Sequence, residues 1–157
     1  MEELNNQKEK SVAIGRLHIE LFGPDGQLKE ERHVYNTIMA VGDAHIAKKM
    51  TGTSEVSMGY MAVGTSDAND NSAQTTLGAE IDRNALTSRT QGAGGDDNDV
   101  IYVGDWAAGD GTDTLKEAGI FNDAAAGTML CRSVFAGIVK GAADTLKITW
   151  TITFGAS

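Results

Sequence analysis

The sequence predicts a mainly β protein, an antiparallel β-sandwich of the jelly-roll kind with one short helix near residues 37–50. Three observations support this prediction. Short extended runs recur from Met58 onward with turn signals between them. No segment between these runs is long enough for the helical crossover that parallel strands need. The chain also holds 19 glycines against a single proline, and such an excess without periodicity indicates many tight turns.

The front of the chain predicts an arm followed by a hairpin. Residues 1–10, MEELNNQKEK, are polar and charged, so we expect a flexible arm that carries no signal-peptide core. A single domain at residues 11–157 follows, and it opens with SVAIGRLHIEL. The turn signal GPDG then returns the chain as QLKEERHVY, whose charges predict an edge strand or a solvated face.

The segment NTIMAVGDAHIAKKMTG predicts the helix. Asn36 or Thr37 is expected to cap its start. Gly42 lowers helix stability by about 1 kcal/mol relative to alanine, which leaves a break at that point open. Four residues are expected to share the packed side of the helix: Ile38, Val41, His45 and Met50.

The middle of the chain predicts one short strand and two polar loops. MGYMAVG is expected to be a buried strand, and TSDANDNSAQT is expected to be a loop. TLGAEIDRNAL fits either a short helical turn or an irregular crossing. Its inward contacts would be Leu77, Ile81 and Leu86. TQGAGGDDND is expected to be the second loop, rich in glycine and then acidic.

Three further strands are expected after that loop. VIYVGDWAA alternates so that Ile101 and Val103 share one face, with Asp105 as a possible third member. LKEAGIF is expected to be a strand that Gly119 interrupts. MLCRSVFAGIV is expected to be a long apolar strand.

The most regular strand is TLKITWTITF, close to the end of the chain. Its apolar residues all fall on one parity and are expected to face the core: Leu146, Ile148, Trp150, Ile152 and Phe154. Each contributes about 1.5–3 kcal/mol when fully buried. We expect this strand to pair with residues 129–139 across the turn KGAAD. Removal of the last ten residues is therefore expected to prevent folding.

Composition limits the classes of partner. A net charge of −9, from 22 acidic and 13 basic residues, disfavours nucleic acids and anionic membranes as partners. No run approaches the ~20 apolar residues of a membrane-spanning helix. Cys131 is the single cysteine, which excludes an internal disulfide and every multi-cysteine zinc pattern.

The sequence contains no recognisable catalytic motif. His18, His33 and His45 lack the close spacing of a metal-binding pair, so no metal site is expected. Cys131 has apolar flanks, with Arg132 expected on the opposite face, and is interpreted as a buried, inert thiol. Serine-hydrolase elbows and phosphate-binding loops are absent from the sequence.

The dense carboxylates all fall in predicted loops, which are poor supports for a pair of catalytic acids. They form three groups: Asp67 and Asp70; Asp96, Asp97 and Asp99; and Asp110 and Asp113. Solvated turns are the preferred interpretation, with calcium binding as the alternative. We therefore expect no enzymatic activity and assign no catalytic, cofactor-binding or metal-binding residues.

Several stretches together resemble small virion proteins of tailed bacteriophages. The stretches are MAVGTSDAND, TTLGAEIDRNAL, TLKEAGIF and KGAADTLKITWTITF. The front also fits the pattern N-x-I-x-x-x-G through Asn36, Ile38 and Gly42. The resemblance covers nearly the whole chain after Lys10, and the acidic insert GAGGDDND departs from it.

The resemblance implies a structural component of the virion, assembled in the host cytoplasm. A capsid decoration or cement protein is the first expectation, with the major capsid protein or other virion proteins as partners and a homo-oligomer as the free form. We expect the apolar parts of residues 100–108 or 128–139 to make the contact.

Two alternatives remain. The first is a head-fibre or tail-fibre adaptor, although no heptad or β-helical repeat is present. The second is a glycan-binding module, which needs exposed aromatic residues. Trp106 is the main candidate for such a residue, and core packing is the preferred interpretation for it.

Overall fold

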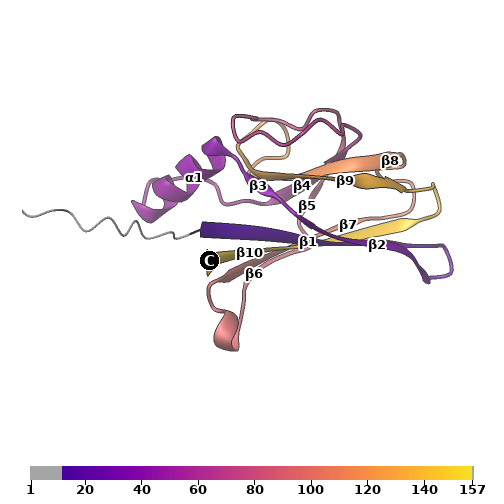
Figure 1. Cartoon of the computed structure of the whole chain (residues 1–157), viewed down its shortest axis with the longest axis horizontal. Coiled ribbons are helices and arrows are strands. Elements are labelled where there is room, and N and C mark those ends of the chain that lie inside the picture. The colour runs from indigo at the N-terminus through magenta and orange to yellow at the C-terminus, as the bar shows by residue number, and fades with distance from the viewer. Residues whose placement is uncertain (1–11, 157) are drawn as a thin grey trace, which may run out of the picture.

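The computed structural model describes residues 12–156, so the arm predicted at residues 1–10 lies outside them. These residues form two antiparallel sheets of five strands each, and the sheets pack face to face (Figure 1). The predicted β-sandwich is confirmed. Among the described residues, no helix combines the length and apolar character needed to cross a membrane.

Sheet A contains both terminal strands of the described chain. Its strands, in spatial order, are β2 (Leu28–Tyr35), β1 (Val12–Phe22), β10 (Thr145–Ala156), β7 (Asp99–Trp106) and β6 (Ser88–Gln91). Strand β2 is an edge strand, as its charges predicted. The hairpin of β1 and β2 is also confirmed.

Sheet B is built mainly from the middle of the chain. Its strands, in spatial order, are β3 (Thr37–Ile38), β9 (Met129–Val139), β8 (Thr114–Phe121), β4 (Tyr60–Gly64) and β5 (Glu80–Ala85). The remaining elements are the helix α1 (Ala40–Met50) and the short 3-10 helix η1 (Gly94–Asp96). Strands from the two ends of the chain pair with each other, β1 with β10 and β3 with β9, as in a jelly roll, whereas the consecutive strands β8 and β9 lie side by side in one sheet.

The terminal strand β10 supplies much of the core between the sheets. Leu146, Ile148, Trp150 and Ile152 are buried, as the alternation predicted. The prediction is wrong for Phe154, which is 36% exposed. Phe154 lies one residue past the register of β10 with β7, which ends at Thr153, so it reaches the open end of the sandwich.

The predicted neighbour of β10 was wrong. Strand β10 pairs with β1 on one side and β7 on the other, whereas β9 belongs to sheet B. The turn KGAAD therefore carries the chain from one sheet to the other. Side chains fix this crossing: Lys140 donates through Nζ to the carbonyl of Ala107, and the Asp144 carboxylate accepts from the amide of Gly141 and from Lys29 Nζ.

The helix begins later than predicted. Residues 37–38 form β3, which pairs with β9, so neither Asn36 nor Thr37 caps the helix. The helix runs unbroken through Gly42. A close contact with β9 explains why this position is glycine. A Cβ at Gly42 would lie 2.3 Å from the carbonyl oxygen of Leu130. His45 is buried with Gly42, but Met50 is 83% exposed, so its predicted place on the packed side was wrong.

Two middle segments differ from their predictions. TLGAEIDRNAL contains the strand β5 rather than a helical turn, and Ile81 is exposed, while Leu77 and Leu86 pack inward. In β7 the inward parity is the opposite of the predicted one. Tyr102, Gly104 and Trp106 are buried, whereas Ile101 and Val103 lie on the outer face beside Thr151 and Thr149 of β10.

Candidate functional site

The outer face of sheet B carries a buried ion pair beneath the segment 65–79. Glu117 on β8 and Arg132 on β9 are both 0% exposed. Arg132 Nε donates to Glu117 Oε2 over 3.0 Å, and the register of β8 with β9 brings the two residues together. A buried pair of this kind is tolerated only where the remaining donors and acceptors find partners.

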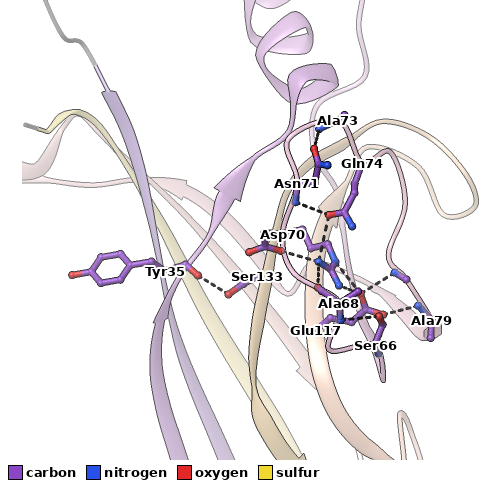
Figure 2. A network of polar contacts seen from close by, with 12 residues as sticks. Tyr35, Ser66, Ala68, Asp70, Asn71, Ala73, Gln74, Ala79, Glu117 and Ser133 are labelled. Carbon is purple, nitrogen blue, oxygen red and sulfur yellow. Dashed lines mark hydrogen bonds and ion pairs between the residues drawn. The ribbon is translucent and has the colours of Figure 1, made fainter.

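The backbone of the segment 65–79 supplies those partners (Figure 2). The Glu117 carboxylate accepts from the amides of Ser66, Gly78 and Ala79, the last over 2.7 Å. Arg132 donates to the carbonyl of Ala68, at 2.9 Å. The ion pair therefore anchors both ends of a polar loop that has little secondary structure of its own.

Asp70, in the same loop, extends the network. Its Oδ1 accepts from Arg132 Nη1 over 2.8 Å. Burial raises the pKa of Asp70, although the Arg132 guanidinium beside it acts in the lowering direction. The prediction of a solvated turn was therefore wrong for Asp70, which packs against the sheet.

A small second core lies beside this network. Five buried residues form it: Met39, Ala62, Leu77, Phe121 and Met129. The guanidinium of Arg83 stacks over the Phe121 ring at 3.7 Å from its centroid, and it also pairs with Glu80 at 2.6 Å. A cation over an aromatic face adds electrostatic attraction to the packing. The outer face of sheet B is thus closed by side chains and by the loop together.

A polar contact also joins the front of the chain to the terminal strand. Trp150 Nε1 donates to Asn36 Oδ1 over 2.9 Å. Gly15 makes room for it, since a Cβ there would overlap the Asn36 side chain. This bond satisfies the indole donor within the core, where an unpaired donor costs about 1–3 kcal/mol.

The cysteine and one of the aromatic candidates are buried. Cys131 is buried, and burial raises the pKa of its thiol well above the usual value, which disfavours the reactive thiolate. Trp106 is buried, as core packing predicted. Tyr35 is the aromatic that stands out, at 69% exposed.

Several of the acidic loop residues have protein partners. Asp67 lies 3.4 Å from Lys116 Nζ, and Asp99 accepts from the hydroxyl of Thr153. Within residues 12–156, no group of three carboxylates brings its oxygens close enough to share one ion. Calcium binding therefore gains no support from the geometry of these loops.

Two of the three histidines meet on the outer face of sheet A. His18 on β1 and His33 on β2 are directly opposite in register, and their rings stack with centroids 4.4 Å apart. His18 Nε2 lies 2.9 Å from Glu31 Oε2. His45 lies elsewhere, on α1. The wide sequence spacing of His18 and His33 therefore did not reveal that the hairpin brings them together.

An apolar groove of about 380 Å³ opens between α1 and the end of sheet A. Met50 and Phe154 line its mouth, while His45 and Tyr102 contribute polar atoms. Burial lowers the pKa of His45 and raises that of Tyr102 to about 12, so both groups are held neutral near pH 7. These two groups line an apolar recess and are not joined by any hydrogen bond to each other.

Comparison with known proteins yields no match to a family model, a curated protein or a solved structure.

Proposed function

We propose that this chain is a non-enzymatic structural component of a tailed-phage virion, a decoration or cement protein that binds the outer shell of the capsid. The observation that supports it most is the role of the motif residues. The residues that carry the resemblance to phage virion proteins contact one another and hold the two sheets and the loop 65–79 together.

The front motif N-x-I-x-x-x-G shows this use. Asn36 binds Trp150 of the closing strand, and Gly42 allows α1 to approach β9. Both contacts are needed for packing, and neither presents a reactive group to solvent.

The back motifs act in the same way. Glu117 of EAGIF anchors the loop, and Phe121 of the same stretch lies under the guanidinium of Arg83. Leu77 completes the small core beside them. The buried charged groups Glu117 and Arg132 hold the surface loop 65–79 in place. A rigid surface of this kind suits a protein that acts by binding through its surface.

The surface available for contact with the shell differs from the one expected from the sequence. The largest apolar side chains of residues 100–108 and 128–139 lie in the core, and Ile101 and Val103 on the outer face are half-buried, so apart from Val139 these stretches offer little exposed apolar surface. The exposed apolar side chains of Met50 and Phe154 line the groove instead, and the exposed Val56 directly precedes its lining residue Ser57. We assign the shell contact to the end of the sandwich where the groove lies, because exposed apolar groups beside a groove are typical of binding surfaces.

The test is to locate the protein in particles of the virus that encodes it. Antibody labelling and cryo-electron microscopy should find many copies over the capsid surface. Label confined to the tail or to fibres would favour an adaptor and contradict decoration. Absence from purified particles would contradict a virion role altogether.

A variant pair tests the assigned surface. Met50→Glu with Val56→Glu should abolish association with capsids that lack the protein. Leu28→Glu is the matched control, since Leu28 is also exposed but lies at the opposite, hairpin end of the sandwich (Figure 1). Equal loss of association in both would contradict the assigned surface.

A further inference from the structure

The stacked histidines on the outer face of sheet A lie within reach of a carboxylate. His18, Glu31 and His33 each offer one ligand atom, and these atoms all lie within 4.8 Å of one another. Two imidazole nitrogens and one carboxylate oxygen form a donor set that Zn²⁺ uses when its fourth position stays open. We propose that these three residues form a site for a divalent transition-metal ion, with Zn²⁺ as the ion best suited to it.

The distances fit a small adjustment of the side chains. A tetrahedral ion with ligands at about 2.0–2.1 Å holds its ligand atoms about 3.4 Å apart. His18 Nε2 and Glu31 Oε2 are 2.9 Å apart, so they need to separate only slightly to bind one ion. His33 must turn toward them, and its exposed position on the edge strand β2 leaves it room to do so.

The relative position of the rings sets the movement that the site needs. The two imidazoles lie nearly parallel, with an interplanar angle of 11° and centroids 4.4 Å apart. The lone pair of an imidazole nitrogen lies in the plane of its ring, so the two rings must tilt toward each other before both nitrogens can bind one ion.

A second carboxylate lies close to His18. Glu20 Oε1 is 3.7 Å from His18 Nδ1, beyond hydrogen-bond distance and on the other side of the ring from Glu31. A small side-chain rotation would bring it into a hydrogen bond with that nitrogen, the arrangement by which a carboxylate orients a metal-binding histidine. The three ligands are His18, Glu31 and His33.

The site is open to solvent on one side. The neighbouring outward residues of β10 are Thr149 and Thr151, which together with Arg16 and Tyr35 border a shallow recess around the histidines. An ion bound there keeps a position for water or for a donor from another molecule. This inference stands on sheet A alone and does not depend on the virion role.

The experiment uses the full chain without a polyhistidine tag, stripped with a chelator and then dialysed. Titration with ZnCl₂ in a calorimeter should show saturable binding of one equivalent. Co²⁺ serves as a spectroscopic probe and should give the visible absorption of a low-symmetry nitrogen and oxygen site, which Zn²⁺ then removes.

The double variant of His18→Gln with His33→Gln should bind Zn²⁺ at least about tenfold more weakly, and Glu31→Gln should weaken it by a similar factor. Two matched controls should bind as the unaltered chain does. Glu30→Gln changes the adjacent carboxylate, which points to the other face of β2, and His45→Gln changes the histidine on α1.

Absence of saturable binding to the unaltered chain would overturn the proposal, and so would equal binding by the double variant. Loss of binding in the controls as well would also overturn it, because the ion would then be held elsewhere. The ligand side chains are exposed or half-buried, so the variants should melt close to the unaltered chain, and thermal unfolding checks this.

Discussion

The outer faces of the two sheets differ in how far they are covered. The outer face of sheet B is covered by the loop 65–79 and holds a fully buried ion pair, whereas the outer face of sheet A is open and lined by threonines, charged groups and histidines. Both sheets have five strands and share one core, so the difference comes from what each outer face must contact. On sheet B, the outward side chains of Glu117 and Arg132 hold the loop in place. On sheet A, the outward side chains are accessible to solutes.

The largest effect should follow from breaking the ion pair of sheet B. Arg132→Met leaves the Glu117 carboxylate buried without its cation, and we expect the free energy of unfolding to fall by about 3–5 kcal/mol. Urea denaturation measures it. Arg16→Met, on the open face of sheet A, is the control and should change the stability by at most about 0.5 kcal/mol. Equal losses in the two variants would remove the contrast between the faces.

A smaller effect is expected where α1 meets sheet B. Gly42→Ala forces a Cβ against the carbonyl of Leu130, so the helix must shift, at a cost of about 1–3 kcal/mol. Helix propensity alone would favour alanine by about 1 kcal/mol. A stabilised variant in the same denaturation assay would show that the helix moves away freely. Gly52→Ala is less suitable as a control because Gly52 has a positive φ.

A pH effect should distinguish buried from exposed histidine. The pKa of His45 lies below its usual value of 6.5, first because of burial and then because of Lys49 and Lys48, with Glu55 acting in the opposite direction. The unfolded chain therefore binds more protons than the folded chain just below pH 6.5, so stability falls as the pH drops through that value.

Urea midpoints at about pH 7.5 and about pH 5.5 measure this loss. His45→Gln should reduce the drop between the two pH values. His33→Gln, on the open face of sheet A, should leave it in place. An unchanged drop in His45→Gln would assign the pH dependence to other groups.

The smallest effect is expected on the open face itself. Thr149 is half-buried on this face between His18 and β7, and Thr149→Val keeps the β-branched shape. The free energy of unfolding should change by at most about 0.5 kcal/mol. A loss above about 2 kcal/mol would mean that this face is structurally constrained in the same way as that of sheet B.

Much of the fold was predictable because alternation is a local property. The buried parity of β1 and β10 and the hairpin turn follow from residue patterns a few positions long. The partner of β10 was not predictable in this way, because a strand with one apolar and one threonine face fits either sheet equally well. The predicted inward face of β7 was also wrong, since Ile101 and Val103 lie outward beside the threonines of β10. Tyr102 and Trp106 lie in the core instead.

The histidine cluster depended on a detail of register. A four-residue turn at residues 23–26 without irregularity would place His18 opposite Glu31. The connection instead has five residues, 23–27, since Phe22 faces Leu28, and the register shifts by one more residue before Leu21 faces Glu30. These two extra residues together bring His33 opposite His18 and leave Glu31 on the diagonal. The buried pair of Glu117 and Arg132 was equally hidden, because its partners come from a loop about 40–60 residues away in the chain.

The pairing of β1 with β10 places Val12 beside Ala156, at the same end of the sandwich. A short peptide could therefore close the chain into a circle without moving either sheet. New ends could then be opened at the solvent-exposed turn of residues 24–26, on the far side of the molecule (Figure 1). Such a permuted chain would present a fused cargo at the end of the sandwich away from α1.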